Sequence, residues 1–470
     1  MSASAAASRP KRWFTGEELI NMQLLIPEKA KQIIQKIEEA GFEAYVVGGC
    51  VRDSILGRRP GDWDITTSAT PQEVKRLFRR TIDTGIQHGT VTVMLGTDGF
   101  EVTTYRLDGD YEDSRHPSRV TFTGSLLEDL KRRDFTINAM AYHPVRGLVD
   151  LFGGQTDLWE GRIRCVGEPA ERFGEDALRM MRAVRFSAQL GFSIEEKTAE
   201  AIRAMAPNLK AVSAERIQTE LTKLLVSGHP DYLRTAYEEG ITAVILPEFD
   251  RCMETPQNTP HHCYTVGEHT LAALREVPSD KVLRYTMLLH DIGKPAVRTT
   301  DDTGRDHFKQ HGPAGEKLAE GILRRLKLDN ETIRMVTWLI RWHDYRPAGE
   351  MKAVRKAVNL IGEEMFPLFL QVQEADMLAQ SLYKRDEKKK RLADVRECYE
   401  KILRDGDCVS LKTLAVNGRD LIEAGFAPGR QMGETLSRLL DHVLDHPEDN
   451  RKEILLRLAE SSGDAENTVQ

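Results

Sequence analysis

The amino-acid sequence predicts an α+β fold, with an α/β unit near the amino-terminal end followed by all-helical segments. Between residues 44 and 106, short runs rich in strand-forming residues alternate with short helical patterns. Beyond Gly161 the pattern changes to long amphipathic helices with few strand signals, as in residues 175–192 and 315–340. Because 470 residues exceed one ordinary hydrophobic core, we expect three or four packed units.

The elements of the α/β unit follow one another along the chain. Apolar residues at helical spacing from Leu24 to about Ala44 predict a helix that stops at Gly41. Proline suits the first position of a helix, so a further helix is expected to open at Pro71. The other expected elements are a buried strand at 44–47, a short helix at 51–57, a strand carrying residues 62–66, and two strands at 88–95 and 99–106 joined by the hairpin turn GTDG.

Composition and charge restrict the function classes. The chain has 66 basic and 73 acidic residues and a formal charge of −7, which argues against a uniformly basic nucleic-acid surface and permits local basic stripes. The six cysteines show no CxxC pair or zinc-ligand spacing, so we expect reduced thiols of a cytoplasmic protein. No run approaches the roughly 18 apolar residues of a membrane span, and no membrane partner is expected.

Two acids, Asp62 and Asp64, lie one residue apart in the predicted strand. Residues i and i+2 of a strand point to the same face, so the two carboxylates would repel unless a cation lies between them. Hard oxygen ligands suit Mg²⁺, and Glu101 on the neighbouring predicted strand can supply a third carboxylate. A bare Asp-x-Asp pattern is more often a solvated strand end or turn, so the flanking residues decide the interpretation.

The residues before the acid pair favour a phosphate ligand. Gly48 and Gly49 allow backbone N–H groups to approach a triphosphate closely. Arg52 offers charge-assisted hydrogen bonds to the same oxygens. The glycine pair, the arginine and the acids together predict a nucleotide site that uses magnesium.

Five ordered motifs carry a resemblance to a known family. They are GGCVRDSILGRRPGDWDITTSAT at 48–70, KRRDFTINAMAY at 131–142, DLFGGQTDLWEG at 150–161, EDALRMMRAVRF at 175–186 and ERIQTEL at 215–221. Residues 25–225 thereby resemble the class II tRNA nucleotidyltransferases, the CCA-adding enzymes related to bacterial poly(A) polymerases. The resemblance implies a nucleotidyltransferase head, Mg²⁺ held by Asp62 and Asp64, and template-free addition of CCA to the tRNA 3′ end from CTP and ATP with release of pyrophosphate.

Three other functions stay open at this point. A poly(A) polymerase shares the head, a CC-only enzyme adds two residues, and a phosphohydrolase could use the head merely to dock RNA. The INAMAY sequence, the ERIQTEL helix and a full-length loop at 105–127 favour the CCA-adding branch. That loop is polar and turn-rich, and in the family a mobile loop here is needed for the switch from C to A addition. This chain departs from the two arginines that members commonly have there, since it carries Arg115 and His116.

The second motif places Arg133 and Asp134 before a run that looks helical. From the residues alone, Asp134 could be a helix N-cap. The resemblance implies that Arg133 contacts the phosphates or the sugar of the nucleotide and that Asp134 recognises the ribose.

The fourth motif places four charged residues three positions apart, which puts them on one broad helix face. They are Asp176, Arg179, Arg182 and Arg185. A solvated, salt-bridged face is the ordinary reading of such a pattern. The resemblance implies that Asp176 and Arg179 hydrogen-bond the edge of the incoming base, while Arg182 and Arg185 lie deeper, near phosphates.

A second candidate site combines imidazoles and carboxylates, which suit a divalent transition metal. Its residues are His269, His290, Asp291, His311, His343 and Asp376, with Lys294 in the HDIGK sequence. They resemble the HD superfamily of metal-dependent phosphohydrolases, in which the first four groups of the core pattern would be His269, His290, Asp291 and Asp376, and His311 and His343 would extend the site to two metals. The alternative is a helical spacer that keeps the fold without activity.

The motifs divide the chain into expected regions. These are a disordered lead-in at 1–22, the nucleotidyltransferase head at 23–160, a neck with the base-recognition helix at 161–228, a body connection at 229–260, the HD domain at 261–380, and a helical tail that binds tRNA at 381–470.

Overall fold

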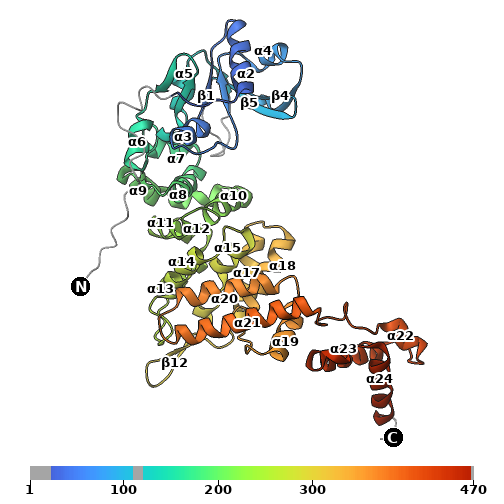
Figure 1. The fold of residues 1–470 in the computed structure, drawn as a ribbon. Helices are drawn as coiled ribbons and strands as arrows, with labels where there is room; N and C mark the ends of the chain where they lie inside the picture. The colour runs from blue at the N-terminus through green and yellow to red at the C-terminus, as the bar shows by residue number, and fades with distance from the viewer. Residues whose placement is uncertain (1–22, 109–119, 467–470) are drawn as a thin grey trace. The chain divides into compact units, whose positions relative to one another are not determined.

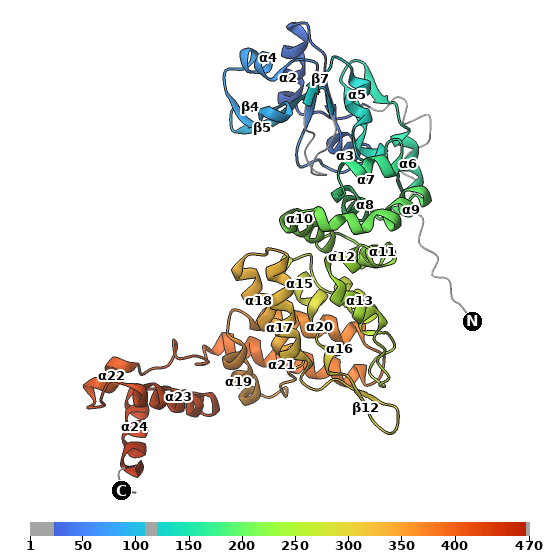
Figure 2. The same cartoon turned by 180° about the vertical axis from the view of Figure 1, so that it is seen from behind.

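A computed structural model describes residues 23–108 and 120–466 of the chain. It consists of two compact units, with the boundary between Ile245 and Leu246 (Figures 1 and 2). The first unit combines a sheet with helices and the second is mainly helical, which confirms the predicted α+β class. The expected lead-in at 1–22, and Arg115 and His116 of the loop, lie outside the described residues.

The first unit is built on a seven-stranded mixed sheet with the order β3-β4-β5-β2-β1-β8-β9. Its strands are β1 (Ala44–Val47), β2 (Ile65–Thr67), β3 (Thr81–Gly85), β4 (Thr90–Leu95), β5 (Asp98–Thr104), β8 (Met140–His143) and β9 (Gly147–Asp150). Two small ribbons, β6 (Arg106–Asp108) with β7 (Val120–Phe122) and β10 (Arg162–Ile163) with β11 (Ser193–Ile194), complete the strands of this unit. In the seven-stranded sheet β2 and β5 run parallel, and its other neighbouring strands are antiparallel.

Helices of the first unit cover the sheet and then continue as a helical segment. They are α2 (Glu28–Glu39), α3 (Gly49–Ile55), α4 (Pro71–Leu77), α5 (Leu126–Lys131), α6 (Gly154–Glu160), α7 (Pro169–Glu175), α8 (Leu178–Leu190), α9 (Glu196–Met205), α10 (Ala214–Leu225), α11 (Leu233–Glu238) and α12 (Thr242–Ile245). The apolar face of α2 is buried through Ile33, Ile34 and Ile37. Helix α4 begins with Pro71 after a Thr70 capping box, as the sequence predicted.

The second unit packs its helices around a buried polar centre. They are α13 (Pro247–Glu254), α14 (Val266–Glu276), α15 (Lys281–Leu289), α16 (Lys294–Val297), α17 (His311–Arg325), α18 (Asn330–Trp342), α19 (Met351–Ile361), α20 (Phe366–Ala379), α21 (Arg385–Asp405), α22 (Gly418–Glu423), α23 (Arg430–Asp445) and α24 (Lys452–Glu466), with a small ribbon of β12 (Thr299–Thr300) and β13 (Asp306–His307). Helices α20 and α21 run side by side in both views (Figures 1 and 2). Helix α20 is buried along most of its length, including Phe366 and Phe369.

Three predicted details of the first unit are wrong. Strand β2 begins at Ile65, so Asp62 and Asp64 precede it instead of lying on it. The helical run expected after Asp134 is a short 3₁₀ turn at Thr136–Asn138 followed by strand β8. Helix α8 begins at Leu178, and Asp176 lies before it in an extended conformation (φ −147°, ψ 103°) that ends α7. Asp176 therefore does not share one helix face with the three arginines.

Two features of the described residues concern disulfides and membrane spans. All six cysteines are unpaired in the structure. Within the described residues, no helix combines the length and the apolar character needed to cross a membrane.

Candidate active site and metal centre

The acidic group of the first unit lies where β2 and β5 run parallel. Ile65 pairs with Val102, so the positions immediately before them bring Asp64 and Glu101 together. Burial raises the pKa of Asp64, the charges of Glu101 and Asp62 raise it further, and Arg133 opposes them. Asp62 and Glu101 are exposed, whereas Asp64 is half-buried. The three carboxylates thus form a site of excess negative charge, which fits a hard cation.

The absence of a side chain at Gly48 leaves room for Arg133 beside the acidic group. Its backbone has φ 81° and ψ −129°, a region that favours glycine, and a Cβ added there would lie 3.0 Å from Nη1 of Arg133. Arg133 pairs with the buried carboxylate of Asp129 at 3.5 Å, and Thr66 donates a 3.0 Å hydrogen bond to the same side chain. Asp129 therefore anchors Arg133 beside Gly48 and Asp64.

Arg52 is directed into the protein. Its Nε and Nη2 donate to the two carboxylate oxygens of Asp53 at 2.9 Å each, and its Nη1 donates to Oδ1 of Asn138 at 2.7 Å. The guanidinium also lies 5.0 Å from the ring centre of Phe186. Gly49 is the first residue of α3, three positions before Arg52, and a Cβ there would lie 3.7 Å from Nη2 of Arg52.

Asp134 lies at the centre of a polar network that links the sheet to α8. Its Oδ1 accepts hydrogen bonds from the backbone N–H of Phe135 (2.8 Å) and from Nδ2 of Asn138 (3.2 Å), and its Oδ2 pairs with Nη2 of Arg182 at 2.6 Å. Burial alone would raise the pKa of Asp134, but the Arg182 guanidinium and the hydrogen bonds from Arg182 and Asn138 outweigh it and lower the pKa to about 2. The carboxylate is therefore ionised and held by its neighbours.

Arginines from two helices surround a single aromatic ring. The guanidinium carbons of Arg52, Arg182 and Arg185 lie 5.0, 5.4 and 3.6 Å from the ring centre of Phe186. Arg185 is buried and its Nε donates to Oε2 of Glu220 on α10 at 2.8 Å. Glu220 is itself buried and thus supplies the counter-charge for this arginine face.

Asp176 and Arg179 are held by different partners. Asp176 accepts hydrogen bonds from the backbone N–H of Leu178 at 3.1 Å and from Nη2 of Arg216 at 2.6 Å. Arg179 pairs with Glu175 and donates to the carbonyl oxygens of Arg172 (3.1 Å) and Arg132 (3.2 Å). Both side chains therefore have fixed orientations despite lying on different elements.

Sequence reasoning missed four members of the first site. Asn138, Glu220 and Arg216 lie inside motifs that the sequence analysis quoted, but no role was assigned to them there. Phe186 ends the fourth motif. A buried acid or amide within a motif rich in arginine was the available signal, since a buried arginine needs a partner.

The second unit brings all six predicted histidines and aspartates together. Nε2 of His269 lies 3.2 Å from Nε2 of His290, 3.6 Å from Oδ2 of Asp291 and 3.0 Å from Oδ1 of Asp376. Five of the six residues form two overlapping groups of three, which we call triads. In each triad the ligand atoms all lie within 4.8 Å of one another. The triads are His269, His290 and Asp291, and Asp291, His311 and His343. Asp291 belongs to both triads.

The histidines of this cluster are oriented by the backbone. The Nδ1 atoms of His290, His311 and His343 lie 2.8, 2.8 and 2.7 Å from the carbonyl oxygens of Met287, Phe308 and Ile340, so each Nδ1–H donates there and each Nε2 faces the cluster. Burial and the neighbouring His343 lower the pKa of His311 to about 4, which makes its imidazole neutral near pH 7. Imidazoles fixed by a second hydrogen bond, together with a shared carboxylate, are a donor set that suits a transition metal.

A cavity of about 420 Å³ opens onto this cluster. Its lining includes Asp291, His311, His343 and Asp376 together with Lys294, Arg305, Lys309 and Arg346. Nζ of Lys294 lies 2.7 Å from Oδ2 of Asp291, and Nη2 of Arg346 lies 2.8 Å from Oδ2 of Asp376. Cations thus border the carboxylates and leave a basic wall facing the cavity.

The sequence analysis did not single out three neighbours of the second site. The ring of His262 packs edge-on against His269 with 5.0 Å between centroids, and burial, Lys294 and His269 lower the pKa of His262 to about 3. Gln380 donates to both oxygens of Asp376 at 3.1 Å, and Arg346 pairs with the same carboxylate. Only their contacts in space connect these residues to the cluster.

The fold and the acidic group of the first unit define a nucleotidyltransferase. Residues 44–164 match the family described as the poly A polymerase head domain, and residues 191–253 match an RNA- and SrmB-binding site of polymerase A. Residues 313–459 match a tRNA nucleotidyltransferase domain 2.

Relatives that align with more than 90% of the chain identify its family among the nucleotidyltransferases. The CCA-adding enzyme of Lactiplantibacillus plantarum is 37% identical over 443 residues, covering 94% of this chain and 97% of that protein. The CCA-adding enzyme of Lactobacillus helveticus is 56% identical, covering 92% and 96%. The crystal structure of the Bacillus stearothermophilus CCA-adding enzyme in complex with CTP has a TM-score of 0.71 and 30% identity, covering 94% of this chain and all of that one. The chain belongs to the CCA-adding enzyme family.

Proposed function

We propose that this protein adds CCA to the 3′ end of tRNA from CTP and ATP without a nucleic-acid template. The observation that carries the proposal is the group of Asp62, Asp64 and Glu101 beside Arg133 in a chain of this family. In the reaction, the terminal 3′-hydroxyl oxygen bonds to the α-phosphorus of the nucleotide and the bond to pyrophosphate breaks. The unpaired cysteines and a tRNA substrate favour a cytoplasmic location.

The side chains of the head have distinct roles in this proposal. Asp62 and Asp64, with Glu101, would hold Mg²⁺, which activates the 3′-hydroxyl and stabilises the triphosphate. Arg133, fixed by Asp129, supplies positive charge to the nucleotide beside the glycine turn. The backbone N–H of Gly48 donates to the carbonyl oxygen of Met140, so the N–H of Gly49, at the start of α3, is the one that would face the phosphates.

Base selection rests on Asp176 and Arg179. An arginine only donates hydrogen bonds and an ionised aspartate only accepts them, so the pair can match the edge of C or A. Arg216 and Glu175 hold the two side chains in position. A wrong base would leave buried polar groups unpaired, which is the physical basis of rejection.

The direct test is to incubate tRNA lacking its 3′ end with CTP, with ATP and with both, and to sequence the products. Addition that stops after CCA supports the proposal. Long A tracts would indicate a poly(A) polymerase, arrest after CC would indicate a CC-only enzyme, and no extension would indicate that the head only docks RNA.

A base-selection variant tests the second part. We expect Asp176→Ala to reduce discrimination of CTP and ATP against UTP and GTP by about tenfold to a hundredfold, since a hydrogen bond to a charged group contributes roughly 1.5–3 kcal/mol. Competition assays with nucleotide mixtures measure the ratio. Full discrimination by this variant would contradict protein-directed base selection.

A second candidate function is supported by the cluster in the other unit, a metal-dependent phosphohydrolase. The two triads that share Asp291, with Nε2 atoms directed inward, fit a pair of divalent transition metals held by His269, His290, Asp291, His311, His343 and Asp376. Such metals would supply an activated water and charge neutralisation for phosphoester hydrolysis.

The protein residues around the cluster favour a phosphoester substrate. Lys294 and Arg346 line the cavity beside the carboxylates and offer donors to phosphate oxygens. Hydrolysis adds water across one P–O bond: the water oxygen bonds to phosphorus and the departing oxygen takes a proton. A 2′,3′-cyclic phosphate on a damaged tRNA end, or another phosphoester, suits a domain fused to an enzyme of tRNA ends.

Elemental analysis of the purified protein and hydrolysis of uridine 2′,3′-cyclic phosphate test this function. We expect bound transition metal and release of a monoester, with both lost in His290→Ala. A protein without bound metal or hydrolysis would be better described by the spacer alternative. In this proposal residues 261–380 form the HD domain that carries the phosphohydrolase site. The tail at 381–470 is proposed to bind the tRNA that the head extends.

A further inference from the structure

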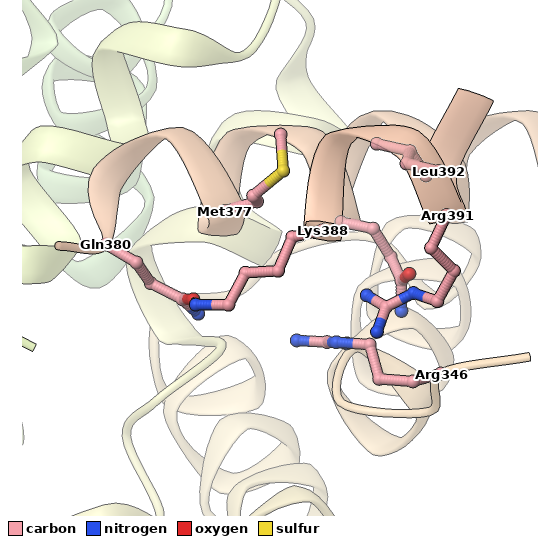
Figure 3. Close-up of a pocket in the computed structure, with 7 residues that line it drawn as sticks. Arg346, Met377, Gln380, Lys388, Arg391 and Leu392 are labelled. Atoms are coloured by element: carbon pink, nitrogen blue, oxygen red, sulfur yellow. The ribbon is translucent and has the colours of Figure 1, made fainter. Parts of the chain in front are cut away.

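A smaller cavity of about 60 Å³ adjoins the metal cavity and is more strongly cationic. It is lined by Arg346, Gln373, Met377, Gln380, Lys388, Arg391 and Leu392, most of which Figure 3 labels. Three of these, Arg346, Gln380 and Lys388, also line the larger cavity. We call the smaller cavity the cationic pocket. The two cavities are therefore adjacent and present the same three polar side chains.

The cationic pocket has more positive charge than its lining compensates. None of the seven lining residues carries a carboxylate. Figure 3 shows the guanidinium groups of Arg346 and Arg391 near each other, while the Lys388 side chain extends towards Gln380. Burial lowers the pKa of Arg391 and the charge of Arg346 lowers it further, whereas the nearby charge of Asp344 opposes this shift without outweighing it. Like charges gathered in a partly buried pocket indicate an anionic ligand.

Arg391 is the clearest donor in the pocket. It has no hydrogen-bond or ion-pair partner among residues 23–108 and 120–466, although its side chain is partly buried. Nζ of Lys388 donates to Oε1 of Gln380 at 2.7 Å, and Arg346 is shared with Asp376 and Asp344. A partly buried guanidinium without a hydrogen-bond partner in the protein can donate to a ligand that supplies acceptors.

The position of these cations on α21 separates them from ordinary surface charge. Lys388 and Arg391 are three residues apart, so they share one face of the helix, and both are partly buried. Lys389 and Lys390, between them in sequence, are exposed. The charged run that the sequence analysis assigned to a solvated helix face therefore contains an inward pair.

The pocket is connected to the metal centre through single side chains. Arg346 lies 2.8 Å from Oδ2 of Asp376, and Gln380 links both oxygens of Asp376 to Lys388. Because Asp376 belongs to the imidazole–carboxylate cluster, a group bound in the pocket lies one residue away from that cluster. About 60 Å³ is several times the roughly 10–15 Å³ that one water needs, so the pocket has room for a larger group.

From these observations we propose that the cationic pocket binds a second phosphate group of the substrate whose phosphoester is hydrolysed at the metal centre. This inference rests on the proposed phosphohydrolase function. The substrate class is a nucleotide or RNA end with a phosphoester at the ribose 2′ or 3′ position and a further phosphate on its 5′ side. Arg391, Lys388 and Arg346 recognise the further phosphate, and hydrolysis takes place only at the first.

A matched pair of substrates tests the subsite in the full-length protein supplied with Mn²⁺. Uridine 2′,3′-cyclic phosphate carries one phosphate, and its 5′-phosphorylated form carries two. Uridine compounds are chosen because the head is proposed to select C and A. We expect the 5′-phosphate to lower KM about tenfold with kcat unchanged, and Arg391→Ala to abolish that gain while leaving the one-phosphate substrate unaffected.

The control variant is Lys389→Ala, which removes an exposed cation of the same helix and is expected to behave as wild type. Arg391→Gln serves as a second variant that keeps a long side chain with good helix propensity. A dinucleotide that ends in a 2′,3′-cyclic phosphate tells the sources apart: an equal gain assigns an RNA end, and a gain confined to the 5′-monophosphate assigns a free nucleotide.

Equilibrium binding gives a readout that needs no metal. Calorimetry with chelator-treated protein should show uridine 3′,5′-bisphosphate binding about tenfold more weakly to Arg391→Ala than to wild type or Lys389→Ala. If the protein hydrolyses both substrates but Arg391→Ala and Arg391→Gln keep the wild-type KM ratio and affinity, the subsite is overturned and the phosphohydrolase stands. If wild type hydrolyses neither substrate, both proposals fail together.

Discussion

The two sites of this protein hold their acidic groups in opposite ways. In the first unit, Asp62 and Glu101 are exposed and Asp64 is half-buried, and the pKa of Asp64 is raised by burial and by its acidic neighbours. In the second unit, His290 and Asp291 are 0% and 1% exposed. Burial raises the pKa of Asp291, but His290 and Lys294 lower it more, so this pKa is well below its usual value.

This difference indicates how each site would receive its metal. Three largely accessible carboxylates with Arg133 as the neighbouring counter-charge suit a hard cation that arrives with a nucleotide and leaves with pyrophosphate. Buried imidazoles, each fixed by a backbone carbonyl, suit a resident metal, because the ligands are oriented before it binds. In the first unit, the side chains that are already fixed by their neighbours are those of the arginine network around Asp134 and Phe186.

The largest effect is expected from removing the open carboxylates. Asp62→Ala combined with Asp64→Ala should lower nucleotide addition by about a thousandfold or more, since metal-assisted charge stabilisation contributes several kcal/mol and each 1.36 kcal/mol is tenfold in rate. Incorporation of labelled CTP and ATP into tRNA measures it, with tRNA binding and phosphoester hydrolysis expected to stay unchanged. Asp98→Ala, an exposed acid on the strand of Glu101, is the control. Extension at the wild-type rate would show that Asp62 and Asp64 are not needed for nucleotide addition.

The arginine network should carry stability as well as geometry. Arg182→Leu leaves Asp134 buried without its main counter-charge, and breaking such a pair typically costs about 3–5 kcal/mol. Urea unfolding measures the loss in the free energy of unfolding. Adding Asp134→Asn, which removes the stranded charge, should restore part of it, whereas Arg419→Leu at an exposed tail position should have little effect. An unchanged unfolding curve would show that the network contributes no stability.

The closed site is tested through the ligand that its two triads share. Asp291→Ala should reduce bound metal and phosphoester hydrolysis by about a hundredfold, because even outer partners of metal ligands cost 10–100-fold when lost. CCA addition should change less than about twofold. Elemental analysis and the two activity assays measure these quantities, with His446→Ala, a half-exposed histidine of the tail, as control. Parallel loss of both activities would mean that the two sites are not independent.

The smallest effect concerns pH. The folded-state pKa of Asp134 is about 2, below its unfolded value of roughly 3.9, so its contribution to stability is complete above about pH 5 and is lost as the pH falls towards 2. The shift corresponds to about 2 kcal/mol. We expect the unfolding free energy of wild type to fall by this amount relative to Asp134→Asn between pH 5 and pH 2, measured by urea titration at each pH. Parallel pH profiles would contradict the assignment.

Local sequence signals predicted the elements that depend on nearby residues. The strand at Ala44–Val47, the helix at Pro71 and the hairpin of β4 and β5 follow from composition, capping and turn chemistry. The INAMAY segment was misread as helical because all four residues of β8 are buried, and a continuous apolar run does not distinguish a central strand from a helix. The break at Asp176 was missed because the three-residue spacing continues across it.

The residue types of the two sites could be predicted from the order of amino acids alone: paired acids after a glycine turn, arginines at helical spacing, and the histidines and aspartates of the second unit. Their partners depend on the folded chain. Arg52 and Asn138 are 86 residues apart, Arg185 and Glu220 are 35 apart, and His269 and Asp376 are 107 apart. Charge pairing and burial act over a few ångströms, so pairs this distant in sequence acquire their partners only when the chain has folded. The same reason hid the cationic pocket, because a run of charges on α21 gives no sign of which side chains turn inward.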